Sequence, residues 1–184
     1  MLSTTLVKLT ALLLTAAVGT SAVESLVPGS SPAARRACYD ETAALHCYNQ
    51  EFDIPQEVAP ADVAFIAAAL RAYGRETRAG RQLVMTAAGA SDCGEWSLYT
   101  RGTAQAVAKK IDMTYDSSVL FEEIANTIDG GTATIKRNGL YECAADGGSF
   151  GVQVNTTAAA YTTAAYVAAG YKPAGIIIKI VANL

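Results

Sequence analysis

The four cysteines constrain this chain most strongly, because they are even in number and all follow an apolar N-terminal segment. They are Cys38, Cys47, Cys93 and Cys143. An even set in a secreted chain is typical of disulfides, whereas a zinc site needs closer pairs such as C-x2-C. We therefore expect two disulfides and no metal. Three pairings are open, of which we favour Cys38–Cys47, closing the N-terminal segment, and Cys93–Cys143, tying two strands together.

The N-terminal segment has the three parts of a secretory signal peptide. Lys8 precedes the apolar run Leu9–Val18, and small residues up to Ala22 follow. A run of about ten apolar residues is too short to span the hydrocarbon core of a bilayer, which is roughly 30 Å thick. We therefore expect residues 1–22 to be a signal peptide cleaved after Ala22, and the protein to be secreted without a stable membrane anchor.

A second processing site follows the expected signal peptide. Residues 23–36 include the linker-like stretch Pro28–Pro32 and end in the dibasic pair Arg35-Arg36. Proteases of the furin and kexin type cut at such pairs, so we expect a pro-peptide over 23–36 and a single domain over 37–184. Two solvated arginines are the alternative. Asn155 opens an Asn-Thr-Thr triplet, an N-glycosylation acceptor that we expect at the surface.

Two segments have apolar residues at helical spacing. The first begins at Pro60 and should stop at Gly74, and its apolar stripe is Val63, Ile66, Ala67 and Leu70. The second is expected to be capped by Asp116–Ser118 and ended by Gly130-Gly131, and its stripe is Leu120, Ile124 and Ile128. A shorter helix is expected within 156–169, before Gly170.

Strand patterns surround these helices. We expect strands over 82–87, 95–100, 102–111, 149–154 and the isoleucine-rich run 175–181. Asn138-Gly139, between Thr132–Arg137 and Leu140–Ala144, predicts a hairpin with a type I′ turn. This order of elements predicts an α+β fold, with two main helices packed on an antiparallel sheet.

Charge and residue types argue against several functions. The net charge of −3 and the sparse basic pairs, Lys109-Lys110 among them, do not favour nucleic-acid binding. The single histidine, His46, lies beside Cys47 and lacks a G-x-S-x-G nucleophile motif, so we expect an exposed loop histidine rather than a catalytic one.

Carboxylates give no clearer catalytic pattern. A glycosidase needs two facing carboxylates, whereas Glu122-Glu123 are adjacent and point to different helix faces. Asp112 and Asp116 have no supporting motif. We therefore expect no catalytic residue, no cofactor and no enzyme, although a carboxylate pair from distant positions stays an alternative.

Tyrosines are the candidate binding residues, because tyrosine suits interfaces and stacking on sugars. Six of them could form an exposed face: Tyr99, Tyr115, Tyr141, Tyr161, Tyr166 and Tyr171. The binding candidates are Tyr99, Tyr141, Tyr161 and Tyr166. Partial burial with the hydroxyls at the surface is the alternative for most of the six.

The middle of the chain also resembles a known group. The residues that carry the resemblance are Leu83-Val84-Met85, Cys93-Gly94-Glu95-Trp96, Leu120, Ile124, Ile128, Gly130-Gly131 and Gly139-Leu140-Tyr141-Glu142-Cys143. Their layout, over residues 62–145, resembles small secreted effectors of plant-associated filamentous fungi. The nearest group is the Ecp2-like (Hce2) necrosis-inducing one, with killer-toxin-like α/β sandwiches as a wider relation. The resemblance implies a non-enzymatic virulence or cell-death-inducing protein, although the last 40 residues or so depart from that group.

These observations predict a secreted effector or toxin-like domain that binds a host or competitor cell-surface protein or glycan and promotes virulence or cell death. A small secreted hydrolase with scattered carboxylates and a structural cell-wall protein are the alternatives. An open cleft with two carboxylates roughly 5–9 Å apart would favour the hydrolase. A closed, alanine-packed core with a flat tyrosine face would favour binding.

Overall fold

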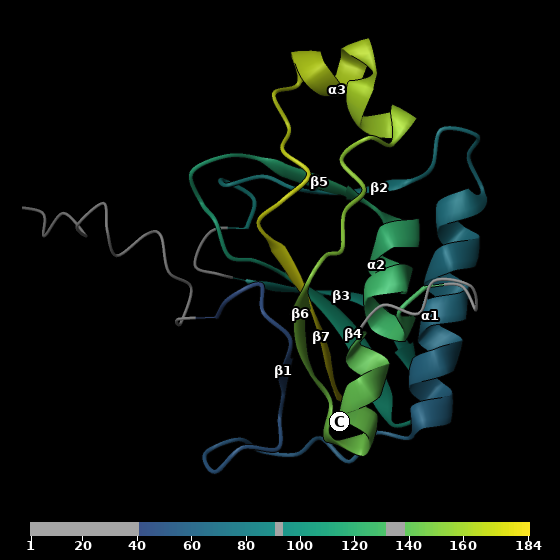
Figure 1. Ribbon diagram of the computed structural model, residues 1–184, viewed down its shortest axis with the longest axis vertical. Helices are drawn as coiled ribbons and strands as arrows, with labels where there is room; N and C mark the ends of the chain where they lie inside the picture. Colours follow the sequence, from purple (N-terminus) through teal and green to yellow (C-terminus); the bar gives the residue numbers. More distant parts are fainter. Residues whose placement is uncertain (1–40, 91–93, 132–138) are drawn as a thin grey trace, which may run out of the picture.

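The computed structural model describes residues 41–90, 94–131 and 139–184 (Figure 1). The signal peptide, the dibasic site, Cys38, Cys93 and the strand expected over 132–137 lie outside the described residues. The elements are β1 (His46–Cys47), α1 (Pro60–Arg75), β2 (Gln82–Met85), β3 (Glu95–Arg101), β4 (Ala104–Lys110), β5 (Ser117–Leu120), α2 (Phe121–Asp129), the 3-10 helix η3 (Leu140–Asp146), β6 (Gly148–Gly151), the 3-10 helix η4 (Ala159–Thr162), α3 (Ala164–Ala168) and β7 (Ile176–Ala182). The α+β prediction is confirmed.

The main sheet has five antiparallel strands in the order β1-β6-β7-β4-β3. The last strand of the chain, β7, therefore lies at the centre, paired with β6 on one side and β4 on the other (Figure 1). Its residues Ile176, Ile178 and Ile180 are buried in the core. The prediction of a buried C-terminal strand is confirmed, and so is the hairpin of β3 and β4.

Helices α1 and α2 lie side by side and pack on one face of this sheet (Figure 1). The part of β4 in the core consists of Ala104, Ala106 and Ala108, whose short side chains let a helix approach the sheet closely. Gly74 does not end α1, which continues to Arg75. A Cβ on Gly74 would lie 2.9 Å from the backbone nitrogen of Glu122, so this glycine permits the contact between the helices rather than stopping one of them.

The segment expected to cap the second helix forms a strand instead. Ser117–Leu120 is β5, which pairs antiparallel with β2 in a separate two-stranded sheet. The Asp116 carboxylate accepts a hydrogen bond from the backbone N–H of Ala87, at 2.7 Å, and so joins the ends of these two strands rather than capping a helix. Helix α2 begins at Phe121, and it ends at Gly130 in the left-handed conformation (φ 78°), as expected.

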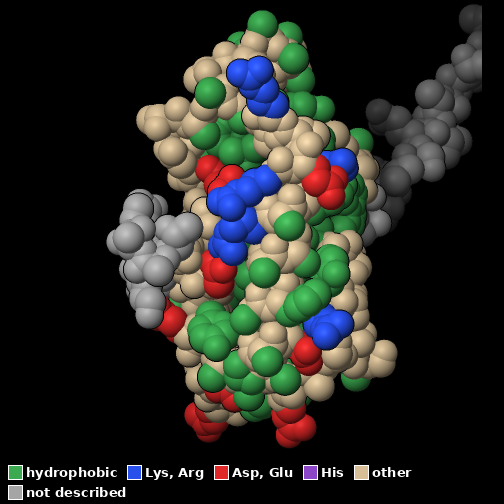
Figure 2. Space-filling model, turned by 90° about the vertical axis from the view of Figure 1, so that its right-hand side faces the viewer, with side chains coloured by type: hydrophobic (Ala, Val, Ile, Leu, Met, Phe, Trp, Pro, Cys, Tyr) green, Lys and Arg blue, Asp and Glu red, His purple; other side chains and the backbone are tan. Residues whose placement is uncertain are grey.

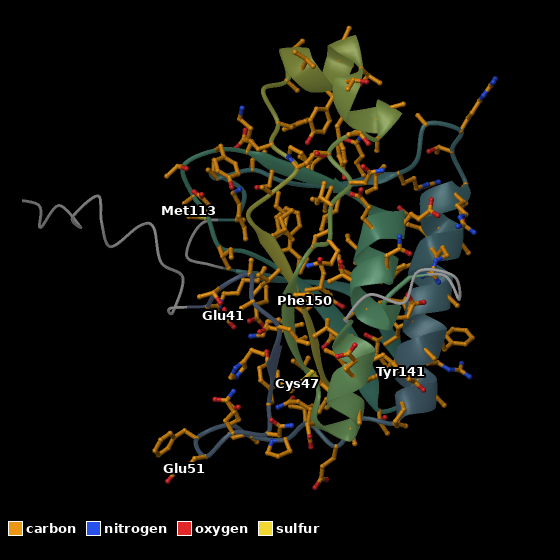
Figure 3. All side chains as sticks on the ribbon, viewed as in Figure 1. Glu41, Cys47, Glu51, Met113, Tyr141 and Phe150 are labelled. Carbon is orange, nitrogen blue, oxygen red and sulfur yellow. A yellow bond between two sulfur atoms is a disulfide. The ribbon has the colours of Figure 1, made fainter. Side chains whose placement is uncertain are left out.

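The disulfide in the described residues joins Cys47 to Cys143, across 96 residues of sequence (Figure 3). Both pairings that we favoured, Cys38–Cys47 and Cys93–Cys143, are therefore wrong. The reason lies in the sheet: β1 pairs with β6, and η3 comes immediately before β6, which brings Cys143 to β1. Gly148 of β6 lies close to both Cys143 and β1. A Cβ at this position would be 3.0 Å from the Cys143 sulfur and 2.5 Å from the His46 carbonyl oxygen, so glycine leaves room for the disulfide.

Three further expectations need correction. Leu140–Ala144 is not the second strand of a hairpin, because η3 occupies it, with Leu140 and Cys143 buried. The expected strand 149–154 is shorter, since β6 ends at Gly151. The helix expected over 156–169 is divided into η4 and α3. Among the described residues, no helix is both long enough and apolar enough to cross a lipid bilayer.

Candidate functional site

The four tyrosines predicted to bind a partner fall into two pairs. Tyr161 and Tyr166 are each only 6% exposed, so the expectation that they lie on a binding face is wrong. Their rings contact each other, with centroids 5.2 Å apart, because η4 and α3 fold back over β5 and the start of α2. Tyr99 and Tyr141 are exposed, as a binding role requires.

The two buried tyrosines serve a network around Glu123. The Tyr161 hydroxyl donates a short hydrogen bond to one oxygen of Glu123 and accepts one from the Leu120 backbone N–H, at 3.0 Å. The other oxygen of Glu123 accepts from the Asn155 backbone N–H, at 2.7 Å. The Tyr166 hydroxyl donates to a backbone carbonyl of β5, at 2.8 Å. The network is closed to solvent, so it holds the C-terminal helices in place rather than forming a reactive site.

Burial sets the ionisation of these groups. It raises the pKa of the Glu123 carboxyl above its usual value, and the hydrogen bond from Tyr161 opposes this rise only in part. Burial also raises the pKa of Tyr166, to about 12. The neighbouring Glu122 faces solvent and pairs with Arg75, so the expectation that these adjacent carboxylates point apart is confirmed.

The single histidine, His46, pairs with a carboxylate. His46 lies in the short strand β1 rather than in a loop, and its Nε2 is 3.1 Å from an Asp53 carboxylate oxygen. The adjacent Cys47 is in the disulfide, so its sulfur is not available as a nucleophile.

Asn155, the glycosylation acceptor, has the exposed position that we expect.

The lysines of β4 are both buried, which the sequence pattern did not indicate. Lys109 pairs with Glu41 and lies 3.8 Å from Glu95, and Lys179 of β7 lies 3.0 Å from Glu41 and 2.6 Å from Glu95. Burial alone would raise the pKa of Glu41, but hydrogen bonds from the two lysines outweigh it and lower that pKa. The result is a compact group of alternating charges on the sheet.

Lys110 has a different environment from its neighbour. It is fully buried, with its Nζ 2.5 Å from the Ser117 hydroxyl oxygen and 5.0 Å from the centre of the Tyr115 ring. Burial lowers its pKa, and the carboxylates of Asp112 and Asp116 oppose that effect. A lysine beside a serine is a known arrangement for nucleophilic catalysis. Here both side chains are fully buried, so a substrate cannot reach the serine in this conformation.

A cavity of about 630 Å³ opens beside this pair. Its described lining is Ile111, Asp112, Thr114, Tyr115 and Gly175. Among these residues Asp112 is the one carboxylate, so the two-carboxylate arrangement of a glycosidase is not present in the described lining. The loop that carries Tyr115 also carries Met113, which lies on the far side of the molecule from α1 (Figure 3).

The outer surface of α1 carries exposed aromatic and small apolar side chains. Phe65 of α1 is 44% exposed and Tyr99 of β3 is 38% exposed, and their ring centroids are 6.3 Å apart. The guanidinium carbon of Arg101 lies 4.4 Å from the Phe65 ring centre. Ala64 and Ala68 are exposed beside them. We call these five residues the Phe65 face. In Figure 2, hydrophobic side chains gather over the lower half of this side of the molecule, with charged side chains around the edges of that half.

Sequence reasoning found only Tyr99 of this face. Phe65 was missed because it lies off the apolar stripe that was used to predict the helix. Arg101 was missed because it falls between the strands expected over 95–100 and 102–111, whereas β3 extends to it. The available signal was the outer side of α1, where alanines and Phe65 stand in place of the charged residues usual on a surface helix.

Fold and surface together define a disulfide-bonded α+β protein with an exposed aromatic face and a separate cavity. Comparison with protein-family models, curated proteins and solved structures finds no match for the chain. The resemblance to the Ecp2-like and killer-toxin-like groups therefore stays a prediction.

Proposed function

We propose that this protein is a secreted effector or toxin-like protein that acts by binding a component of host or competitor cell surfaces through the Phe65 face. The observation that carries the proposal is the contact of two exposed aromatic rings, Phe65 and Tyr99, with Arg101 stacked on one of them. Aromatic residues and arginine are enriched in interfaces and supply much of their binding energy.

The residues of the Phe65 face are positioned by regular secondary structure in the unbound protein. Phe65 lies within the first half of α1, while Tyr99 and Arg101 lie in β3, paired with Ala106 and Ala104 of β4. Asp62 lies 3.9 Å from the Arg101 Nε, and it accepts hydrogen bonds of 2.9 and 3.0 Å from Thr103. A surface already fixed by regular elements loses less conformational entropy on binding than a flexible loop does.

Secretion is supported by two independent features. The N-terminal segment has the pattern of a signal peptide, and a disulfide closes a long stretch of the chain, as is typical of proteins that fold in an oxidising compartment. The cell-death or virulence role is supported by the resemblance described above. The hydrolase alternative gains no support from the cavity, whose described lining offers a single carboxylate.

The test is to apply the purified, fluorescently labelled secreted protein to plant tissue and to microbial cells, and to measure both surface binding and cell death. Phe65→Ala combined with Arg101→Gln is expected to weaken cell binding roughly thirtyfold, since central interface residues contribute about 2 kcal/mol or more. Phe52→Ala is the matched control, because it removes an aromatic ring that is 93% exposed elsewhere on the surface. It should bind as the unmodified protein does.

Two results would overturn the proposal. One is equal cell binding by the double variant and the unmodified protein. The other is the absence of any binding or cell response, together with measurable hydrolysis of a glycan or a nucleic acid by the unmodified protein. A sample with its disulfide reduced serves as the control for folding.

A further inference from the structure

The open cavity beside Tyr115 has the size of a small-ligand site. Its volume of about 630 Å³ lies within the range of roughly 300–1,000 Å³ that is typical of such sites. One wall follows β4 and the other precedes β7. The Ile111 backbone N–H donates to the Gly175 carbonyl oxygen at 2.9 Å, so a hydrogen bond joins the two walls.

Tyr115 supplies an aromatic wall whose position is fixed from two sides. The Lys110 Nζ lies 5.0 Å from the ring centre, and Lys110 itself is fully buried. Near the hydroxyl end, Gly175 adopts φ 75°, and a Cβ at this position would lie 2.9 Å from the Tyr115 hydroxyl oxygen. Glycine therefore leaves room for the ring to stand against this wall of the cavity.

Asp112 supplies the hydrogen-bond acceptors. Its Oδ1 accepts from the backbone N–H and the hydroxyl of Thr114, at 2.9 and 2.6 Å. The hydroxyl bond is the main cause that lowers the pKa of the Asp112 carboxyl, so the group is ionised at neutral pH and acts only as an acceptor. The Tyr115 hydroxyl also donates to this carboxylate, so three hydrogen bonds leave one of its roughly four lone-pair sites for a ligand hydroxyl.

The charges around the cavity select a neutral ligand. An anionic ligand would meet the Asp112 carboxylate in the cavity lining. A cationic ligand stacked on Tyr115 would share the ring with the Lys110 side chain, which already lies against it. A neutral ring that offers hydroxyl donors on its rim and C–H groups on its face satisfies both the carboxylate and the aromatic wall.

We propose that this cavity binds a neutral sugar ring of a glycan, with the ring stacked on Tyr115 and its hydroxyls donating to Asp112. The site is separate from the Phe65 face, and it rests on the proposed function only in that the glycan would belong to the same cell surfaces. The protein would then bind a cell surface through two sites: the cavity would bind a sugar, and the Phe65 face would bind a second component.

Saturation-transfer NMR and calorimetry with defined oligosaccharides test this proposal on the secreted protein. The probes are neutral trisaccharides of glucose, N-acetylglucosamine and mannose, with tri-glucosamine as a cationic probe of similar size. At least one neutral trisaccharide should bind, and Asp112→Asn should weaken it about tenfold, which is the loss expected for one charge-assisted hydrogen bond. Asparagine keeps an oxygen for Thr114, so the variant should fold.

The controls separate this site from the Phe65 face. Glu51→Gln changes another surface carboxylate and should bind the sugar as the unmodified protein does. Phe65→Ala should also leave sugar binding unchanged, whatever it does to cell binding. The proposal fails if no neutral trisaccharide binds, if Asp112→Asn binds equally well, or if tri-glucosamine binds more tightly than every neutral probe. Each of these results leaves the proposed role of the Phe65 face standing.

Discussion

Replacing Tyr161 by phenylalanine removes a single buried hydroxyl on which two parts of the structure depend. That hydroxyl donates to the Glu123 carboxylate and accepts from the Leu120 backbone N–H. A hydrogen bond to a charged group contributes about 1.5–3 kcal/mol, and one between neutral groups about 0.5–1.5 kcal/mol. Where Glu123 is ionised, the expected loss in the free energy of unfolding is therefore about 3 kcal/mol, equivalent to a fall in Tm of roughly 6–12 °C for a domain of this size.

The loss should depend on pH because Glu123 titrates. Its folded-state pKa is raised above the ordinary value of 4.5, so between 4.5 and the raised pKa the folded protein binds more protons than the unfolded one. Stability therefore falls as pH rises through this window. The Tyr161 hydrogen bond favours the ionised form, so its removal should raise the Glu123 pKa further. The Tyr161→Phe loss is then largest above the window and smaller below it.

Urea unfolding of the purified protein, with its disulfide intact, measures both effects at a series of pH values. Tyr141→Phe is the matched control, since it removes the hydroxyl of an exposed tyrosine and should change stability little. The reasoning is refuted if Tyr161→Phe unfolds within about 0.5 kcal/mol of the unmodified protein at neutral pH, which is the range of ordinary surface substitutions. A large loss that is the same at every pH would refute the role assigned to Glu123.

Three further predictions follow from the packing. Peptide mapping should recover Cys47 joined to Cys143, and a peptide joining Cys38 to Cys47 would contradict the fold. Replacing both cysteines by serine should lower the free energy of unfolding by up to about 4.7 kcal/mol, the value for a closed loop of this length. Gly74→Ala should lower Tm although alanine is favoured in helices by about 1 kcal/mol, because its Cβ meets the backbone of α2; a higher Tm would count against the described helix contact. Lys110→Met should stabilise the protein at neutral pH, because it removes a buried charge. The folded-state pKa of Lys110 is lowered, so the unmodified protein gains stability as pH rises from that pKa to the ordinary lysine value of 10.5. The difference in stability between the variant and the unmodified protein should therefore shrink over this pH range. Lys109→Met should instead destabilise the protein, because it breaks the ion pair with Glu41. A gain in stability for Lys110→Met that does not depend on pH would argue against a buried charge at Lys110.

Elements with a complete local pattern could be predicted from the sequence. The apolar stripe from Val63 to Leu70 defined α1, and the isoleucines after Gly175 defined β7. Elements that depend on a distant partner were predicted wrongly. Asp116–Ser118 has the residues of a helix cap, but pairing with β2 makes Ser117 and Ser118 part of a strand.

The candidate site was predictable only in part, for the same reason. Tyr99 was correctly placed at the surface, whereas Tyr161 is buried because Glu123 and Leu120 form hydrogen bonds to its hydroxyl. The cavity joins Asp112 to Gly175, which are far apart in the chain and meet only because β4 and β7 are neighbours in the sheet. No local sequence pattern indicates that these two residues lie close together.

The sequence by itself determined the features whose cause is local. The apolar stripe from Val63 to Leu70 specified α1, the isoleucine-rich run specified the central strand β7, and glycine at Gly130 ended α2. Only the tertiary structure decided which cysteines pair, which lysines are buried and which tyrosines face solvent. These properties depend on the order of strands in the sheet, because that order sets which distant side chains are brought within bonding distance and which are left exposed.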